Sequence, residues 1–211
     1  MLRVEDTVLI LLAAGRSERF GDVGSKLEEE FLGKPLGLHV AGALAVLPFR
    51  DRIAVTGRAR LDYASRGYRE VPNADPGEGM GSSVRIGVAA AKAQGAKAVL
   101  IALADMPRVT AAHVMRLYDA AANGDTVVAS SDGVDPKPPA LFGADKFEFL
   151  MALDGDKGAR DLVRAGRHVV TNPAELIDID TPAEMERLRA LIGSREARTL
   201  AVRRADPIDG E

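Results

Sequence analysis

Residues 8–26 read V-L-I-L-L-A-A-G-R-S-E-R-F-G-D-V-G-S-K, and this stretch bears on both the fold and the chemistry of the chain. The apolar run from Val8 to Leu12 predicts a buried strand that leads directly into a loop. Gly15 carries no Cβ, so the backbone can adopt a positive φ there and come close to a ligand. Backbone N–H groups and side-chain cations together suit a polyphosphate, so we predict a nucleoside triphosphate site at this strand end. The cations that the loop supplies are Arg16, Arg19 and Lys26.

Two familiar phosphate-binding motifs are absent from this stretch. It lacks G-x-x-x-x-G-K-[ST], which marks a P-loop, and it lacks G-x-G-x-x-G, which marks a dinucleotide-binding turn. A glycine turn with solvated arginines, which is common in α/β proteins, is the simple alternative. The rest of the chain therefore has to distinguish a polyphosphate site from an ordinary turn.

The composition limits the possible functions. The chain has 211 residues, enough for one large α/β domain with a substantial core. Its formal net charge of −3 lacks the basic surplus that marks nucleic-acid binders. It contains no cysteine, which excludes disulfides, thiolate metal sites and a cysteine nucleophile. The histidines at positions 39, 113 and 168 lack metal-ligand spacing, so we expect structural roles for them.

The N-terminal segment does not predict a membrane span or a secretion signal. Charged residues precede the apolar run from Val8 to Ala14, which is too short to span a bilayer or to form a signal peptide. We therefore expect a cytoplasmic protein with no membrane and no nucleic-acid partner. Residues 1–194 are predicted to form a single domain, and the charged tail 195–211 is expected to be partly disordered or to contact a partner.

Apolar runs alternate with amphipathic stretches, a pattern typical of an α/β fold with a three-layer, doubly wound, mostly parallel sheet. The predicted strands are Thr7–Leu12, Arg52–Thr56, Arg69–Val71, Lys97–Ala102, Thr126–Ser130, Ala140–Phe142, His168–Val170 and Leu176–Ile179. The predicted helices are Lys34–Val46, Ser82–Gln94, Ala111–Asn123, Ala144–Ala152, Gly158–Ala165 and Pro182–Ile192.

A second informative stretch is V-L-I-A-L-A-D-M-P at residues 99–107. The continuous apolar run is typical of a parallel strand that is buried on both faces. Because ligands bind outside the carboxyl ends of such strands, Asp105 is expected beside the loop after the first strand. A carboxylate that faces phosphates needs a cation between them, and Mg²⁺ binds one or two carboxylates together with substrate phosphates. The alternative for Asp105 is a turn or helix-capping role.

A third stretch, D-I-D-T-P-A-E at residues 178–184, carries two more carboxylates. Residues two apart on a strand point to the same face, so Asp178 and Asp180 could aim the same way. One of them could be a second metal ligand. Asp180 could instead cap the helix that follows, which needs no ligand.

The stretch N-A-D-P-G-E-G-M-G-S-S at residues 73–83 leads into a predicted helix. Small residues and two hydroxyls at a helix N-terminus can form a pocket whose backbone, with Ser82 or Ser83, binds a base or a ribose. The simple alternative is a glycine-rich turn in which a serine is an ordinary N-cap.

Taken together, these stretches resemble the molybdenum cofactor cytidylyltransferase branch of the MobA-like NTP transferases. The loop from Leu12 to Lys26 is similar to the family signature L-A-A-G-x-S-x-R-x-G…K. The D-M-P at Asp105, the D-I-D-T-P-x-E that begins at Asp178 and the glycine–serine stretch that ends at Ser83 are similar to further motifs of the family.

The resemblance implies a nucleotide-diphospho-sugar transferase-like, Rossmann-like fold and the transfer of a nucleotidyl group. A phosphate monoester on an acceptor would attack the α-phosphorus of an NTP, and pyrophosphate would leave. Residues 138–142 and 153–160 resemble the family's P-x-L-F and G-D-x-G-A-R stretches, which implies that they shape the acceptor side. L-A-A-G accompanies cytidine in these families, so Ala14 implies CTP, with molybdopterin or another phosphate-bearing small molecule as acceptor and a molybdenum hydroxylase as a partner.

The resemblance also assigns roles to individual residues. Those implied in catalysis are Arg19, Lys26 and Asp105. Those implied in binding the nucleotide are Leu12, Ala13, Ala14, Gly15, Arg16, Ser17, Asn73, Gly79, Met80, Gly81, Ser82 and Ser83. The implied cofactor is Mg²⁺, held by Asp105 with Asp178 or Asp180. We favour Asp178, because Asp180 lies nearer the cap of the following helix.

One stretch departs from the family pattern. Where relatives have an apolar run after the lysine, this chain has L-E-E-E-F at residues 27–31. Carboxylates beside a triphosphate are unfavourable unless they point away or hold metal. Lys26 could therefore be displaced, and Lys34 is then the alternative cation.

Two rival functions stay open on the sequence. One is a sugar- or polyol-phosphate nucleotidyltransferase, or one that uses GTP, which would share the first strand, Asp105 and the metal. The other is a non-catalytic nucleotide- or cofactor-binding maturation factor for molybdenum hydroxylases. The acidic run and the charged tail are the features that favour the maturation factor.

Overall fold

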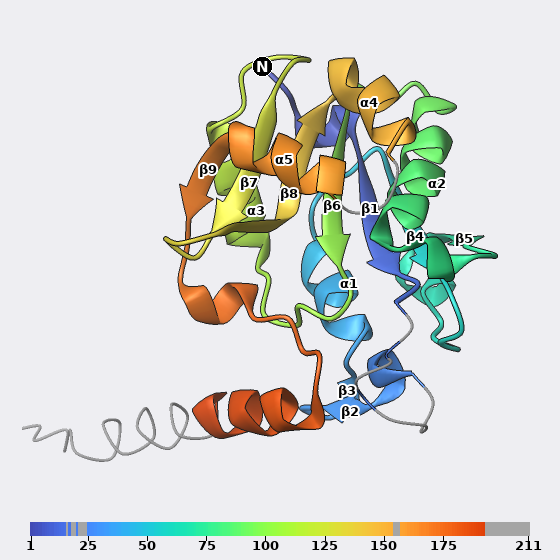
Figure 1. Cartoon of the computed structure of the whole chain (residues 1–211), viewed down its shortest axis with the longest axis vertical. Helices are drawn as coiled ribbons and strands as arrows, with labels where there is room; N and C mark the ends of the chain where they lie inside the picture. Colours follow the sequence, from blue (N-terminus) through green and yellow to red (C-terminus); the bar gives the residue numbers. More distant parts are fainter. Residues whose placement is uncertain (16, 18–19, 21–24, 154–156, 193–211) are drawn as a thin grey trace, which may run out of the picture.

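The computed structural model describes residues 1–15, 17, 20, 25–153 and 157–192, so the predicted tail 195–211 lies outside the described residues. Within these ranges, seven strands form one sheet with helices on both faces (Figure 1). The strands are β1 (Thr7–Ala13), β4 (Asp51–Thr56), β5 (Arg69–Pro72), β6 (Ala98–Leu103), β7 (Val127–Ser131), β8 (Pro136–Gly143) and β9 (Arg167–Val170). The helices are α1 (Leu38–Leu44), α2 (Met80–Lys92), α3 (Ala111–Asp119), α4 (Phe147–Met151) and α5 (Lys157–Ala165), with a further helix over 182–192.

The sheet is mostly parallel, as the sequence predicts, and its strand order is β5-β4-β1-β6-β8-β7-β9. β1 pairs in parallel with β4 on one side and with β6 on the other, whereas β8 is antiparallel to both β6 and β7. After β1 the chain forms β4 and β5, then returns to form β6 on the opposite side of β1. In open α/β sheets, ligands bind outside the carboxyl ends of the strands at such a reversal of strand order.

The central strand β1 is buried along its whole length, which explains its continuous apolar sequence. Its alternate side chains enter two cores. Leu9 and Leu11 belong to the core that α1 and α3 cover, whereas Val8 and Ile10 belong to the core that α2 and α4 cover. Burial of each such side chain stabilises the fold by about 1.5–3 kcal/mol. The two cores confirm the predicted three-layer arrangement.

The helix predicted over Lys34–Val46 begins later than predicted. Residues before it form a hairpin of β2 (Glu30–Phe31) and β3 (Lys34–Pro35). The two residues between these strands, Leu32 and Gly33, have φ values of 49° and 79°. Two positive φ values in a two-residue loop are typical of a type I′ hairpin turn, whose twist suits antiparallel strands. This turn chemistry prevents the helix from starting before Leu38.

The strand predicted over Leu176–Ile179 is wrong. The chain instead forms a short 3₁₀ helix, η7 (Pro173–Leu176), which Asn172 caps through a hydrogen bond from the Ala174 N–H to Asn172 Oδ1 at 3.0 Å. An extended segment follows, and the Ile179 N–H donates to the Asp105 carbonyl at 3.0 Å. The segment that carries the last two aspartates is therefore held against the end of β6.

A third, smaller core joins the hairpin to the C-terminal segment. Phe31 and Leu36 pack with Ile179, Met185 and Leu188. In Figure 1 the helix over 182–192 and the β2–β3 hairpin lie together at one end of the molecule, below the sheet. This packing holds the segment before the helix next to the loop that follows β1.

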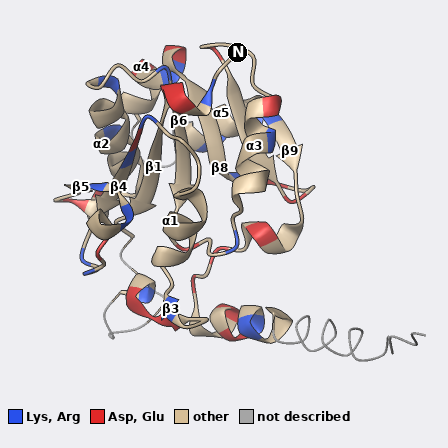
Figure 2. Ribbon diagram, turned by 180° about the vertical axis from the view of Figure 1, so that it is seen from behind, with Lys and Arg blue, Asp and Glu red and all other residues tan. Residues whose placement is uncertain are grey.

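The surface carries both signs of charge. Figure 2 shows Lys and Arg interspersed with Asp and Glu, while the central strands carry few of them. Within the described part of the chain, no helix combines the length and the apolar character needed to cross a membrane.

Candidate functional site

A cavity of about 410 Å³ opens at the carboxyl ends of β1 and β6, where the strand order reverses. This volume is in the range of small-molecule sites. We call it the β1 cavity. It is lined by Leu12, Ala14, Gly15, Ser17, Lys26, Leu27, Pro76, Gly77, Gly79, Met80, Ser83, Leu103, Asp105 and Asp180. The structure therefore brings together residues from four of the sequence motifs.

A second cavity of about 400 Å³, which we call the β8 cavity, adjoins the first, because Met80 and Leu103 line both. Most of its walls are apolar, and its charged residues are Asp135, Lys137, Arg160, Arg164 and Asp178. Residues 138, 140 and 142, and Ala159 with Arg160, come from the two stretches that the resemblance assigned to the acceptor side.

The loop after β1 is held in an unusual conformation. Ser17 has a φ of 57°, which is rare for a residue other than glycine, and its hydroxyl accepts a hydrogen bond from the Lys26 N–H at 3.0 Å. Such backbone strain is typical of functional sites that the surrounding structure stabilises. Ala13 lies in the core behind the loop. The predicted Arg16 and Arg19 lie outside the described residues.

Lys26 is buried at the centre of an ionic cluster that is itself only partly buried. Its side chain is only 8% exposed, and its Nζ lies 2.7 Å from Asp105 Oδ2 and 2.7 Å from Asp180 Oδ1. The second oxygen of Asp105, Oδ1, has almost no accessible surface and no hydrogen-bond partner among the described residues. Buried polar atoms are rarely left unpaired, so this oxygen distinguishes the cluster from a fully satisfied structural ion pair.

The pKa values within this cluster depend on one another. Burial alone would lower the pKa of the Lys26 ammonium, but the attraction of Asp105 and Asp180 outweighs it, so that pKa is raised. Burial raises the pKa of the Asp105 carboxyl; Lys26 opposes that effect, and Asp178 and Asp180 reinforce it. The carboxylates can therefore converge only where a cation accompanies them.

The acidic run beside Lys26 does not displace it. Glu28 accepts a hydrogen bond from the Ser25 N–H in a capping box and another from the Arg60 N–H at 2.9 Å. Glu29 and Glu30 are exposed. In the described structure Lys34 belongs to the hairpin strand β3 and is not part of the wall of the β1 cavity. Lys26, rather than Lys34, is thus the lysine that the fold places in the site.

The two aspartates of the C-terminal motif face different cavities. Asp180 lines the β1 cavity beside Lys26, whereas Asp178 lines the β8 cavity. The capping role considered for Asp180 belongs to Thr181, whose Oγ1 accepts a hydrogen bond from the Glu184 N–H at 3.2 Å. The prediction that both carboxylates share one face depended on a strand that does not form.

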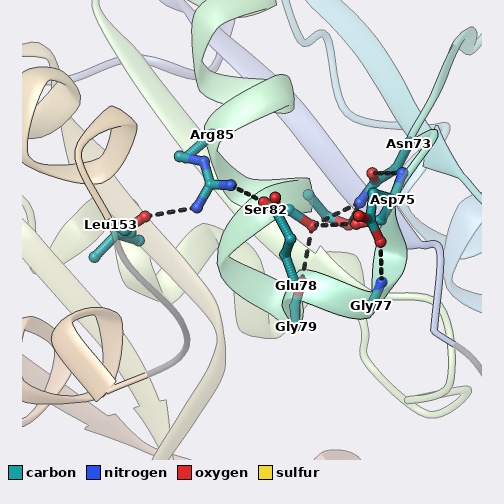
Figure 3. Close-up of polar contacts among 9 residues, drawn as sticks. Asn73, Asp75, Gly77, Glu78, Gly79, Ser82, Arg85 and Leu153 are labelled. Carbon is teal, nitrogen blue, oxygen red and sulfur yellow. Dashed lines mark hydrogen bonds and ion pairs between the residues drawn. The ribbon is translucent and has the colours of Figure 1, made fainter.

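The loop before α2 is organised by Asn73 (Figure 3). Its Nδ2 donates to Ser82 Oγ at 2.8 Å and to Ser83 Oγ at 2.9 Å, and its Oδ1 accepts from the Asp75 N–H at 3.0 Å. Gly79 has a φ of 87°, a conformation that favours glycine, directly before the helix. In the described structure, Asn73 and Ser82 support the loop from behind, while Gly79 and Ser83 line the β1 cavity and Gly81 lines the β8 cavity.

Arg85 of α2 links the two sides of the site, and sequence reasoning missed it. Its guanidinium donates to Glu78 and, at 2.6 Å, to the Leu153 carbonyl (Figure 3). Glu78 belongs to the loop beside the β1 cavity, and Leu153 follows α4 in the stretch assigned to the acceptor side. The signal available in the sequence was that Arg85 lies about one turn beyond Ser82 and Ser83 on the predicted helix.

Gly57 is a second residue that sequence reasoning missed. A Cβ at this position would lie 2.9 Å from the Cα and from the carbonyl oxygen of Ala14. Glycine at the end of β4 therefore allows the loop after β1 to pack against it. The available signal was a glycine that directly follows a predicted strand, Arg52–Thr56.

A cavity at the strand-order reversal, with a buried lysine beside two carboxylates, suits a phosphate-bearing ligand and agrees with the nucleotide site expected from the sequence. The chain belongs to the family described as the MobA-like NTP transferase domain, whose model matches residues 9–170. The match confirms the resemblance to MobA-like NTP transferases that the sequence motifs indicated.

Known relatives agree with this assignment. The purine catabolism protein PucB of Bacillus subtilis (strain 168) is 31% identical over 198 residues, which cover 85% of this chain and 94% of PucB. The crystal structure of Rv0371C from Mycobacterium tuberculosis H37Rv in complex with manganese is 25% identical, with a TM-score of 0.67 over 87% of this chain and 98% of that chain. A nucleotidyl transferase from Methanothermobacter thermautotroptrophicus (Mth528) shares the fold at 22% identity, with a TM-score of 0.70 over 87% and 96% of the two chains.

Proposed function

We propose that this protein transfers CMP from CTP to the phosphate of molybdopterin or the molybdenum cofactor and releases pyrophosphate. The observation that carries the proposal is the β1 cavity itself. It places the loop after β1, Lys26, Asp105 and the N-terminus of α2 around one space at the strand-order reversal. A nucleoside triphosphate needs these elements together.

The chain's own groups bind and neutralise the triphosphate in this proposal. The glycine-bearing loop after β1 and the N-terminus of the 13-residue helix α2 offer backbone N–H groups and a positive dipole end. Lys26 supplies a cation within the cavity wall, and Arg19 is proposed as a second one. Positioning and charge neutralisation are most of what phosphoryl chemistry asks of a protein.

The donor set also suits a divalent cation such as Mg²⁺. Asp105 and Asp180 converge on one point from two elements, and hard cations prefer carboxylate oxygens. Among the described residues, no group of three or more potential ligands gathers, so substrate phosphates would complete the shell. A bound divalent ion would stabilise charge that develops on the phosphates. The relative solved with manganese supports a metal in this family, and we assign Asp180 rather than Asp178 as the second ligand.

The β8 cavity is the proposed acceptor site. Its apolar walls suit the body of a pterin, and Lys137 and Arg160 can attract its phosphate. The second pKa of a phosphate monoester is about 6, so the attacking oxygen is already ionised near neutral pH and no general base is required. That oxygen forms a bond to the α-phosphorus, and the bond between the α-phosphorus and the bridging oxygen breaks to release pyrophosphate.

The preference for cytidine rests on Ala14. L-A-A-G accompanies cytidine in the families that this loop resembles, and Ala14 is among the residues that line the β1 cavity. Gly57 packs against the Ala14 backbone, which helps to hold this part of the loop in place. A pyrimidine fits a narrowed pocket better than a purine.

The test is to incubate the protein with each of the four NTPs and Mg²⁺, with molybdopterin or a sugar or polyol phosphate as the acceptor, and to measure pyrophosphate. We expect release with CTP only, and much slower release by the matched Asp105→Asn variant. Release with a sugar or polyol phosphate, or with GTP, would indicate the rival transferases. Nucleotide binding without pyrophosphate release for any acceptor would indicate a maturation factor for molybdenum hydroxylases.

A further inference from the structure

Lys26 occupies a position that a metal ion would also need. Its Nζ lies 2.7 Å from one oxygen of Asp105 and 2.7 Å from one oxygen of Asp180, so the ammonium bridges the two carboxylates. The other Asp105 oxygen is sealed from solvent. An ion that arrives through the β1 cavity therefore meets Asp105 through Oδ2, the oxygen that Lys26 already holds.

The ammonium and a divalent ion cannot share these oxygens. Both need to lie within bonding distance of Asp105 Oδ2 and Asp180 Oδ1, and their positive charges repel each other in a partly buried site. Two carboxylates are also a weak site for Mg²⁺ or Mn²⁺, which usually draw further oxygens from substrate phosphates. Without a polyphosphate, the lysine is the better counter-ion for this pair.

The geometry gives Lys26 a second place to go. Its backbone N–H is bonded to Ser17 Oγ at 3.0 Å, which fixes the residue at the edge of the loop after β1. Its flexible four-carbon stem allows the ammonium to turn while the backbone stays in place. The same side chain lines the β1 cavity, so a polyphosphate bound there would lie within its reach.

We propose that Lys26 is an internal counter-ion that makes metal binding depend on the nucleotide. The ammonium holds Asp105 and Asp180 together until a polyphosphate draws it into the β1 cavity, and the freed carboxylate oxygens then accept the metal. This inference rests on the proposed function for the identity of the polyphosphate and the metal. Because coupling between two ligands is reciprocal, each of them should tighten the binding of the other.

The decisive measurement is Mn²⁺ binding by electron paramagnetic resonance, with no nucleotide present, in the wild type and in Lys26→Met. If Lys26 blocks the carboxylates, the variant binds Mn²⁺ at least tenfold more tightly than the wild type, a difference of about 1.4 kcal/mol. A lysine that only contacts phosphate would leave Mn²⁺ affinity unchanged. Lys146→Met is the matched control, because Lys146 pairs with Asp125 at the surface, and it should not alter Mn²⁺ binding.

Two further measurements guard against a variant that folds poorly. Lys26→Gln serves as a second variant because it keeps a polar side chain. Mn²⁺ should raise the melting temperature of both Lys26 variants more than it raises the melting temperature of the wild type. In the wild type, inorganic triphosphate should tighten Mn²⁺ binding by a larger factor than in either Lys26 variant. When Asp105→Asn is added to either Lys26 variant, the gain in Mn²⁺ affinity over the wild type should disappear.

The outcomes separate this inference from the proposed function. Equal Mn²⁺ affinity in the wild type and both Lys26 variants, with cytidylyl transfer intact in the wild type, would overturn the counter-ion role alone. Tighter Mn²⁺ binding by the variants, with no pyrophosphate release from CTP by the wild type, would support the counter-ion role and overturn the proposed transfer.

Discussion

Two clusters of polar side chains lie wholly or partly inside this molecule, and they differ in how completely their polar atoms are paired. The first, formed by Lys26, Asp105 and Asp180, borders the β1 cavity and leaves Asp105 Oδ1 without a hydrogen-bond partner among the described residues. The second, which we call the α3 network, is centred on His113 and Ser130, both of them buried. Comparing them leads to separate predictions for activity and for stability.

The α3 network pairs the polar atoms of its two central side chains. His113 Nε2 lies 2.7 Å from Ser130 Oγ, and that hydroxyl donates to the Pro139 carbonyl at 2.7 Å. Arg116 donates to His113 Nδ1 at 3.0 Å and to Thr171 Oγ1 at 2.7 Å. A fully paired network rigidifies a core, whereas an incompletely paired one beside a cavity has capacity left for a ligand. Substitutions in the first cluster should therefore affect activity, and those in the second should affect stability.

The largest effect is expected for Asp105→Asn. The amide keeps the shape of the side chain but loses the charge that faces Lys26 and the proposed metal. We expect the rate of pyrophosphate release to fall by about 10²–10³-fold or more, since removal of one electrostatic contact in a transition state typically has this effect. Activity at saturating Mg²⁺ and the circular dichroism spectrum are the measurements. Activity close to that of the wild type would remove Asp105 from the site.

The next effect separates the two aspartates of the C-terminal motif. Asp180→Asn should lower activity by about 10²-fold, because Asp180 contacts Lys26 in the β1 cavity. Asp178→Asn is the matched control from the neighbouring cavity, and its rate should change by less than about tenfold. Steady-state kinetics with CTP and molybdopterin measure both. If Asp178→Asn lowered the rate more than Asp180→Asn, Asp178 rather than Asp180 would be the second metal ligand.

The sequence predicted the first cluster's members better than their arrangement. Lys26 and Asp105 are recognisable because each follows an apolar strand in a motif, and parallel strands bring their carboxyl ends together. The preference for Asp178 rested on Asp180 lying nearer the helix cap, whereas in the structure Thr181 provides the cap and Asp180 contacts Lys26. The backbone hydrogen bond from Ile179 to Asp105 and the packing of Ile179 against the hairpin help to hold this segment beside Lys26, and no local pattern encodes these long-range contacts.

The main elements of the fold were also predictable from the sequence, but some of the connections between them were not. The period of the apolar residues identified the buried strands, because a strand covered on both faces has few polar positions. It could not identify the hairpin over Glu30–Pro35, since Leu32 at a positive φ is an unusual residue for that turn. Nor could it show that Arg85 bridges Glu78 and Leu153, a contact between residues far apart in the sequence.

The third prediction concerns the α3 network. Ser130→Ala removes the hydroxyl that accepts from His113 and donates to Pro139, and it leaves both of those buried groups unpaired. The free energy of unfolding should fall by about 1–3 kcal/mol, as is usual for a buried group that loses its partner. Urea denaturation measures it. Cytidylyl transfer at a temperature well below the melting point should stay at the wild-type rate, and a loss of activity without a loss of stability would contradict the comparison.

The smallest expected effect is a dependence of stability on pH through His113. Burial lowers the pKa of this imidazole below its usual 6.5, and the nearby Arg116 lowers it further, although Glu175 opposes both. The hydrogen bonds agree with a neutral ring: Nε2–H donates to Ser130, while Nδ1 accepts from Arg116 and has no room for a proton. Near and below pH 6.5 the His113 imidazole binds a proton in the unfolded chain but stays neutral in the folded chain. Stability should therefore fall as the pH drops through that value.

The slope that one such proton can produce is at most about 1.4 kcal/mol per pH unit. Unfolding of the wild type and of His113→Gln in urea, at a series of pH values from 8 to 5.5, measures it. The variant should be less stable at pH 8, where the α3 network is intact in the wild type, and it should lose less stability on acidification. His39, whose pKa is also lowered by burial, leaves a residual slope in the variant that His39→Gln should reduce. Parallel slopes for the wild type and His113→Gln would show that the imidazole titrates alike in the folded and unfolded chain, and the neutral, fully paired state of the α3 network would then be wrong.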